Sequence, residues 1–262
     1  MPREIAHVED PGDERIAAYR DVGDPAALRA GGRFVAEGRL VVQRLVEDAR
    51  FTVESVLVTR AAFEGLRTTL ERITAPVLVC APAVMNSVTG FNFHRGCLAL
   101  ARRPGADTSI DALLPAHRLL VIEGVGNPDN IGGIFRAALA LGADGVVLDP
   151  RSGDPLYRKA IRTSMAATLR LPFARMRLSD ARPALKANGF AVVALTPSVD
   201  AIDIADVPSA PKMALLLGSE GAGLSAEALA LADIRARIPI DPAADSLNVA
   251  VAAGIAMYAL MT

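Results

Sequence analysis

Three loops hold the residues whose types and spacing could do chemistry. The first, residues 123–149, runs from a strand-like segment through a glycine-rich turn into a helix. The second, residues 215–225, is an apolar strand followed by three glycines and one acid, and the third, residues 238–260, ends in a helix of small and apolar residues. Glycines let backbone N–H and C=O groups approach a ligand closely, so the three loops predict a binding site.

The first loop resembles a nucleotide-binding turn only in part. Asp129 stands where a dinucleotide fingerprint needs its third glycine, and no glycine–lysine–serine or glycine–lysine–threonine follows as in a P-loop. Asp149 ends the next strand, as a ribose-binding acid would, so a dinucleotide-dependent oxidoreductase stays an alternative. Asp129 or Asn130 could cap the helix. Arg136, about 600° around the helix from Asn130, is on its own typical of a solvated position.

The second and third loops contain polar residues next to glycines or at the start of an apolar helix. Gly218 begins a loop that contains more glycines than a tight turn needs. Glu220 either takes part in a binding site in this loop or is placed there because an acid is favourable at the N-terminal end of the following helix. Ser246 is a reasonable N-cap for the last helix. That helix is apolar nearly all round, which predicts burial in the core or in a subunit interface, with Asn248 near its start.

Strand-like and helical segments alternate from residue 117 to the end of the chain. The strands are expected at 118–123, 145–149, 169–174, 190–195, 213–218 and 237–240. This alternation predicts an α/β fold with a mostly parallel sheet and helices on both faces. Ligands bind at the carboxyl ends of strands in such sheets, and the three loops lie there.

A second, smaller α/β domain is expected over residues 32–103. Its segments are a helix at 34–48, a strand at 55–59, a helix at 63–73 and strands at 75–81 and 96–103. Residues 104–116 have the polar, Pro- and Gly-containing character of a linker, and residues 117–262 form the larger domain. Residues 1–31 are rich in Asp, Glu, Gly and Pro and predict an irregular or weakly helical arm.

Charge gives only local support for a nucleic-acid partner, because the formal net charge is −1. Residues 151–177 contain seven basic residues and one acid. Within this stretch Arg158, Lys159 and Arg162 are predicted to face RNA phosphates, although a solvated helix surface would explain them equally well.

The remaining composition narrows the class of protein. Cys80 and Cys97 form no CxxC pair and have no histidine cluster beside them, so both are expected as core thiols and no metal site is indicated. The longest apolar run, residues 249–261, is shorter than the roughly 20 residues of a membrane span. The polar N-terminus lacks the pattern of a secretory signal, so a cytoplasmic protein without a membrane partner is expected.

Three motifs resemble the signatures of SpoU-type RNA methyltransferases, the TrmH-like family of the SPOUT superfamily. They are Asn130-x-Gly132-x-x-x-Arg136, Leu217-Gly218-Ser219-Glu220-Gly221 and Ser246-Leu247-Asn248-Val249-Ala250-Val251. The resemblance covers about residues 118–262, and residues 32–103 resemble the substrate-binding domain that many members carry. Gly133 departs from the alanine or serine of many relatives. The short C-terminus, without a basic extension, favours rRNA over tRNA as the substrate.

The resemblance implies a trefoil knot in the sheet, a homodimer through the catalytic domain, and RNA as the partner. It implies that S-adenosyl-L-methionine is the cofactor, contacted near Leu195, Thr196, Gly218, Ile238 and Leu247. The implied reaction is methylation of a ribose 2'-hydroxyl without a metal. A non-catalytic RNA-binding protein that keeps the fold stays an alternative.

The resemblance also implies roles for five side chains. Arg136 acts on the 2'-hydroxyl, while Asn130, Glu220, Ser246 and Asn248 position that group or the RNA. A guanidinium stays protonated in proteins, so stabilisation of the developing alkoxide is the favoured role for Arg136.

Overall fold

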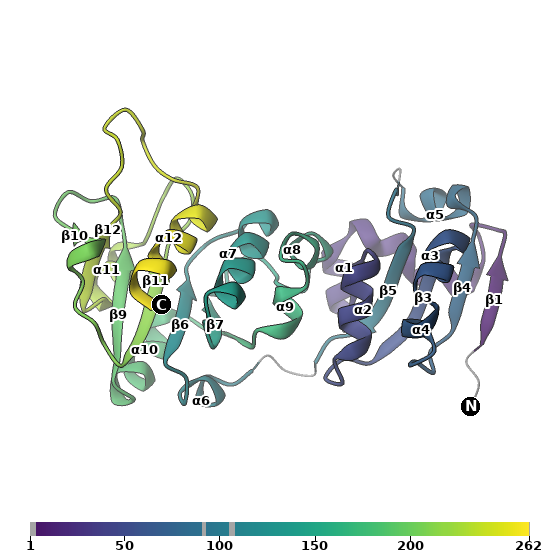
Figure 1. Ribbon diagram of the computed structural model, residues 1–262, viewed down its shortest axis with the longest axis horizontal. Coiled ribbons are helices and arrows are strands. Elements are labelled where there is room, and N and C mark those ends of the chain that lie inside the picture. Colours follow the sequence, from purple (N-terminus) through teal and green to yellow (C-terminus); the bar gives the residue numbers. More distant parts are fainter. Residues whose placement is uncertain (1–3, 91–92, 105–107, 262) are drawn as a thin grey trace. The chain divides into compact units, whose positions relative to one another are not determined.

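The structure, a computed structural model, describes residues 4–90, 93–104 and 108–261. Contacts within the chain define two units (Figure 1). The first comprises Met1–Ala106 and Leu156–Ala166, and the second comprises Asp107–Pro155 and Ala167–Thr262. The boundary at residue 106 falls inside the predicted linker, of which residues 105–107 lie outside the described residues. The segment Leu156–Ala166 was expected in the second unit and belongs to the first.

A seven-stranded sheet forms the centre of the second unit. Its order is β10-β12-β9-β11-β6-β7-β8, and all its pairings are parallel. The strands are β6 (Arg118–Ile122), β7 (Gly145–Leu148), β8 (Phe173–Arg175), β9 (Phe190–Leu195), β10 (Ile202–Asp203), β11 (Lys212–Leu217) and β12 (Ile234–Arg237). The α/β fold with a parallel sheet is therefore confirmed, while the trefoil knot stays a prediction.

Helices cover both faces of this sheet, as predicted. They are α6 (Ile110–Leu113), α7 (Pro128–Ala140), α9 (Ala167–Arg170), α10 (Leu178–Ala187), α11 (Ala226–Leu231) and α12 (Val249–Met261), with a short 3₁₀ helix η2 (Ile204–Asp206). Alternate residues of a strand point to opposite faces, so Leu119 and Val121 of β6 join the core under α6, α10 and α11. On the other face α7 and α12 pack together.

The strand expected at residues 237–240 is placed wrongly. β12 ends at Arg237, three residues after its start at Ile234. The apolar residues Ile238 and Ile240 flank Pro239, which has no N–H to donate to a neighbouring strand. These residues instead form part of a loop at the edge of the sheet.

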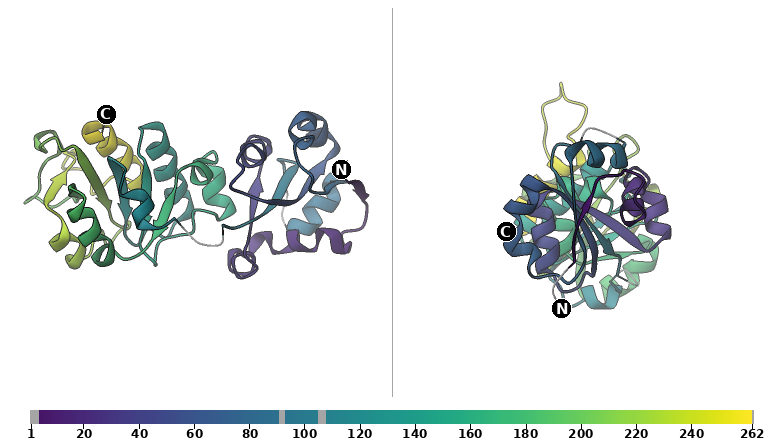
Figure 2. Two further views of the ribbon diagram at one scale, coloured as in Figure 1. Left: turned by 90° about the horizontal axis from the view of Figure 1, so that it is seen from below. Right: turned by 90° about the vertical axis from the view of Figure 1, so that its right-hand side faces the viewer.

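The first unit contains a five-stranded mixed sheet, seen in two further views in Figure 2. Its order is β1-β4-β3-β5-β2, in which β5 runs antiparallel to both of its neighbours. The strands are β1 (Ile5–Val8), β2 (Arg33–Glu37), β3 (Val53–Thr59), β4 (Val77–Cys80) and β5 (Cys97–Arg102). The helices are η1 (Glu14–Gly23), α1 (Pro25–Ala30), α2 (Arg39–Glu47), α3 (Arg60–Gly65), α4 (Arg67–Leu70), α5 (Pro82–Thr89) and α8 (Arg158–Thr163).

The segment expected as an irregular or weakly helical arm, residues 1–31, is described from residue 4; it contains the helices η1 and α1, but it is an integral part of the first unit and not a separate arm. β1 extends the sheet beside β4, and η1 buries Ile16, Tyr19 and Val22 completely. These three residues are spaced by three, which places them on one face of a 3₁₀ helix with three residues per turn. A search for the 3.6-residue period misses this pattern. Tyr19 Oη lies 2.9 Å from Ser55 Oγ of β3, which ties the segment to the sheet.

The predicted helix at residues 34–48 is half wrong. Its first part is β2, and the helix α2 begins only at Arg39. Gly38 separates the two with a φ of 98°, a conformation that favours glycine and interrupts a helix. The helix at residues 63–73 likewise falls into two short helices, α3 and α4.

Candidate active site

A cavity of about 600 Å³ lies at the carboxyl ends of β9, β11 and β12. All five residues predicted to contact a cofactor line it, and they come from four segments of the chain: Leu195, Thr196, Gly218, Ile238 and Leu247. Parallel strands bring their carboxyl ends to one edge, so loops distant in sequence meet there.

The loop after β11 is folded tightly on itself. Ser219 N donates to Gly223 O (3.2 Å), and Gly223 N donates to Ser219 O (3.0 Å). Gly221 and Gly223 have φ of 86° and 68°, which only glycine adopts readily. A Cβ on Gly218 would lie 2.3 Å from the carbonyl carbon of Gly223. The loop itself therefore requires glycine at position 218, which also lines the cavity.

Asn248 forms hydrogen bonds with two of the other predicted side chains. Its Nδ2 donates to Asn130 Oδ1 (2.9 Å) and to Glu220 Oε1 (2.8 Å). Its Oδ1 accepts hydrogen bonds from the N–H groups of Ala250 and Val251, which caps α12. Asn130 is buried, whereas Glu220 and Asn248 line the cavity. One amide thus connects the first and second loops to the start of the last helix.

The structure corrects three expected caps. Asn127 caps α7 through its Oδ1, which accepts from Asp129 N, so neither Asp129 nor Asn130 has this role. Asn248 replaces Ser246 as the cap of α12. Ser246 still lines the cavity, close in sequence to Asn248.

Arg136 lies outside the hydrogen-bond network of Asn248. It is exposed on α7, and it forms no hydrogen bond or ion pair with any of the residues that the structure describes. Its side chain is consequently accessible to a ligand that approaches α7 from solvent.

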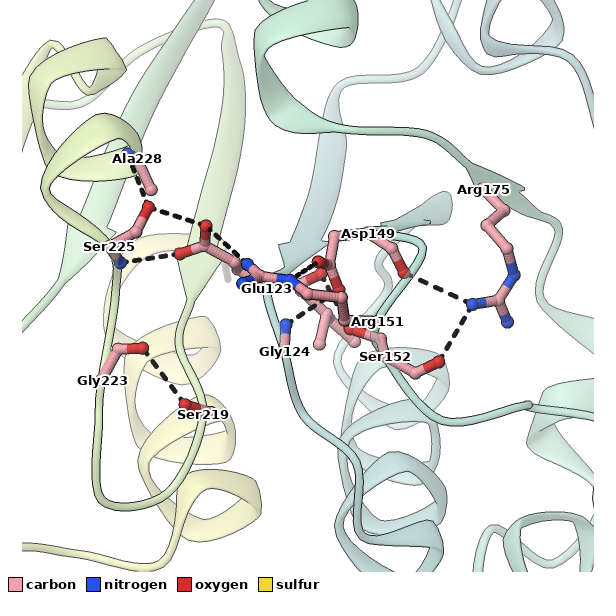
Figure 3. Close-up of polar contacts among 11 residues, drawn as sticks. Glu123, Gly124, Asp149, Arg151, Ser152, Arg175, Ser219, Gly223, Ser225 and Ala228 are labelled. Carbon is pink, nitrogen blue, oxygen red and sulfur yellow. Dashed lines mark hydrogen bonds and ion pairs between the residues drawn. The ribbon is translucent and has the colours of Figure 1, made fainter.

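A second group of polar residues, shown in Figure 3, ties the ends of β6, β7 and β11 together. Glu123 accepts hydrogen bonds from Ser225 N and Ser225 Oγ, both at 2.8 Å. Arg151 Nη2 lies 3.3 Å from Glu123 Oε1, and Arg151 Nε lies 2.9 Å from Asp149 Oδ2. Glu123 therefore fixes the far end of the loop that begins at Gly218. Glu123 and Ser225 were not predicted; the serine preceding the helix 226–231 was the available signal for a cap.

Asp149 is held by its neighbours and not presented to a ligand. Its Oδ1 accepts from Gly124 N (2.8 Å) and Ser152 Oγ (2.6 Å). Burial raises the pKa of Asp149, but the hydrogen bonds from Ser152, Gly124 and Arg151 outweigh this effect and lower the pKa below its ordinary value. An ionised carboxylate bonded in this way argues against the ribose-binding role and so against the oxidoreductase alternative.

The basic residues between 151 and 177 are divided between the two units. Arg151 pairs with Glu123 and Asp149, whereas Arg158 and Arg162 lie in the first unit and pair with Glu37. Arg158 is buried and its guanidinium is 2.8 Å from Glu37 Oε2, so a direct phosphate contact by this residue does not fit its position. Lys159, also on α8, is half-buried.

Both cysteines are buried and free, as expected for core thiols. Burial raises the pKa of Cys80 to about 11 and that of Cys97 to about 12, so both stay protonated at neutral pH. Within the described residues no cluster of His, Cys, Asp or Glu could hold a metal ion. The helices described here are all too short or too polar to cross a membrane.

The chain combines an α/β unit, built on a parallel sheet with a cavity at its carboxyl edge, with a smaller unit built on a mixed sheet, and it resembles known proteins over both units. The model of the SpoU rRNA Methylase family matches residues 117–258. An "Uncharacterized tRNA/rRNA methyltransferase" of Mycobacterium bovis is 38% identical, covering 97% of this chain and 91% of that protein. The chain belongs to the SpoU rRNA methylase family.

Two further comparisons concern a more distant relative and a solved structure. The 23S rRNA (guanosine(2553)-2'-O)-methyltransferase of Bacillus subtilis is 35% identical over 57% of this chain and 60% of its own length. The complex of the SpoU methyltransferase AviRb from Streptomyces viridochromogenes with AdoMet has a TM-score of 0.81 at 26% identity, covering 94% of this chain and 97% of that one.

Proposed function

We propose that this protein transfers a methyl group from S-adenosylmethionine to a ribose 2'-hydroxyl of RNA, with rRNA favoured over tRNA. The observation that carries the proposal is the Asn130–Asn248–Glu220 network at the rim of the cavity. The relative from Bacillus subtilis, whose name specifies 2'-O-methylation of rRNA, supports the choice of the ribose hydroxyl.

The cavity suits S-adenosylmethionine in size and in lining. Its volume of about 600 Å³ lies within the usual range for small-molecule sites. Leu195, Ile238 and Leu247 offer apolar surface for a planar base, and the loop from Gly218 offers backbone N–H and C=O groups. The carboxylates of Glu220 and Asp245 also line the cavity, and acids of this kind suit a cationic sulfonium. The bound cofactor would supply an activated methyl group.

Transfer to a hydroxyl requires in-line alignment and loss of the hydroxyl proton as attack proceeds. Asn248 fixes Glu220 and Asn130 relative to each other, which keeps two oxygen-bearing side chains in place beside the cavity. Arg136 supplies a permanent cation that can stabilise the developing alkoxide and an adjacent phosphate.

We also propose a homodimer through α12. Val251, Ile255 and Tyr258 are 52%, 41% and 70% exposed, and their spacing of four and three places them on one face of the helix. Such an apolar stripe suits an isologous contact with a second copy. Sedimentation should give a dimer that Ile255→Glu dissociates. Leu40→Glu, at a residue equally exposed in the first unit, is the control and should remain dimeric.

Two measurements test the proposed activity. Isothermal titration should detect binding of S-adenosylmethionine and none of NAD. Maps of 2'-O-methylation in ribosomal and transfer RNA, from cells with and without the gene, should differ at one or more riboses. RNA binding without S-adenosylmethionine binding would instead establish the non-catalytic RNA-binding alternative.

A further inference from the structure

A buried carboxylate in the first unit has more cationic partners than it needs. Glu37, the last residue of β2, has a side chain only 4% exposed. Its Oε2 lies 2.8 Å from Arg158 Nη1, and its Oε1 lies 3.4 Å from both Arg162 Nη1 and Arg95 Nε. One partner would satisfy a buried negative charge. Three arginines against one acid leave a formal excess of two positive charges.

The three arginines differ in what they offer to solvent. Arg158 is 10% exposed, and its Nε donates to Val22 O (3.1 Å), so its role is to hold Glu37 in place. Arg162 is 33% exposed and Arg95 is 55% exposed. Each of these two has one guanidinium nitrogen 3.4 Å from Glu37 and exposed surface left for another anion. A shared carboxylate therefore orients two accessible cations.

Backbone contacts bring two more arginines to the same edge of the sheet. Gly38 N donates to Cys97 O (3.0 Å), and Thr59 N donates to Gly96 O (2.9 Å). The residues after Gly38 and Thr59 are Arg39 and Arg60, which begin α2 and α3 and are exposed.

The balance of charge elsewhere on the unit is different. Arg50 pairs with Asp48, Arg72 with Glu47, and Arg67 with Glu64. Glu64 is the acid nearest in sequence to Arg60 on α3, and it pairs with Arg67. Glu54 pairs with two arginines, Arg33 and Arg102, which leaves an excess of one positive charge. Among these ion-paired groups of the described residues, the largest excess therefore lies around Glu37.

We propose that this edge, which we call the Glu37 edge, binds the phosphodiester backbone of the RNA substrate. Arg95 and Arg162 contact phosphate, Glu37 is a positioning residue, and Arg158 anchors Glu37. Planar guanidinium groups in a fixed orientation suit two-pronged phosphate contacts. The proposal rests on the proposed function only in taking RNA as the substrate.

Fluorescence anisotropy with the full chain and a fluorescein-labelled RNA stem-loop tests the proposal over a range of salt. Arg95→Gln with Arg162→Gln should weaken binding on the order of 20-fold at about 0.1 M salt and make its salt dependence shallower, because two phosphate contacts are lost. Arg50→Gln with Arg72→Gln removes the same charge near the other end of α2 and should change affinity less than about twofold. Equal weakening by both pairs, or none by the first, overturns the proposal.

The variant Glu37→Gln distinguishes between two explanations of RNA binding, a site in which Glu37 orients the arginines and a patch that attracts RNA by net charge alone. It removes a negative charge, so attraction by net charge alone would tighten RNA binding. Loss of orientation should instead weaken binding to a similar extent as the arginine pair, in a variant whose thermal melting shows it to be folded. Tighter binding contradicts the positioning role of Glu37. If Glu37→Gln does not fold, the double variant of Arg95 and Arg162 still tests whether the Glu37 edge binds RNA.

Failure of the proposed function can be distinguished from failure of this inference. A wild-type chain that binds RNA but neither binds S-adenosylmethionine nor transfers methyl refutes the function and leaves the Glu37 edge standing. A chain that methylates RNA while the arginine pair variant keeps full RNA affinity refutes the Glu37 edge alone.

Discussion

Two polar clusters, one in each unit, are held together by different forces. The Asn248 cluster uses an amide between a buried Asn130 and Glu220, and it sits where loops follow parallel strands. The Glu37 edge uses charges, and Arg158 lies 121 positions along the chain from its partner Glu37. Hydrogen bonds from one amide depend on local geometry, whereas the binding strength of exposed charges depends on salt. The two proposals assign chemistry to the second unit and binding of a polyanion to the first.

The sharpest test of this division is Gly218→Val. A side chain at Gly218 would overlap the backbone at Gly223, at 2.3 Å, so the loop must open. We expect loss of measurable S-adenosylmethionine binding by isothermal titration, with RNA affinity retained. Gly126→Ala is the control, because a Cβ there meets no atom within 4 Å. A folded Gly218→Val variant with unchanged cofactor affinity would falsify the loop's role.

Arg136→Ala should separate chemistry from binding within the second unit. We expect the methylation rate to fall on the order of 100-fold, because a cation that stabilises the transition state is removed. S-adenosylmethionine affinity should be nearly unchanged. Arg136→Lys should recover little activity, since it lacks the planar two-pronged geometry. A single-turnover assay at saturating RNA and cofactor measures this, and wild-type rates in Arg136→Ala would return the residue to a surface role.

In the first unit, Arg158→Met should reduce stability more than function. Removing one partner of a buried ion pair costs about 3–5 kcal/mol, and the two remaining arginines should lower this to about 2 kcal/mol. Arg162→Met, at a position 33% exposed, should cost less than about 1 kcal/mol. Urea unfolding followed by circular dichroism compares the two. Equal costs would show that Arg158 does not anchor Glu37.

The smallest expected effect concerns the packing of α7 on α12. A Cβ at Gly133 would lie 2.8 Å from Ala250 Cβ, so Gly133→Ala should destabilise the chain by about 1 kcal/mol after the gain in helix propensity. Gly254→Ala is the matched control, because its Cβ would lie 3.9 Å from Ala137 Cβ. It should stabilise the chain slightly, by about 0.5 kcal/mol. The same sign for both in thermal melting would contradict tight packing at Gly133.

The accuracy of the sequence predictions differs between the units for a physical reason. The strands β6, β9 and β11 were predicted correctly from their apolar runs, and the helix α7 from its helical period, because these elements are buried and regular. The errors fall on short or irregular elements. The 3₁₀ helix with Ile16 and Tyr19 has a three-residue period, and Gly38 separates a strand from a helix within one apolar stretch.

The sequence by itself determined the family, the parallel sheet of the second unit and the residues that line the cavity. Each of these depends on a local period or on a motif with fixed spacing. Only the tertiary structure showed that Asn248 joins Asn130 to Glu220, that Gly218 is crowded by its own loop, and that Glu37 gathers three arginines. Such contacts join residues far apart in the chain, and no local pattern records which side chains folding will bring together.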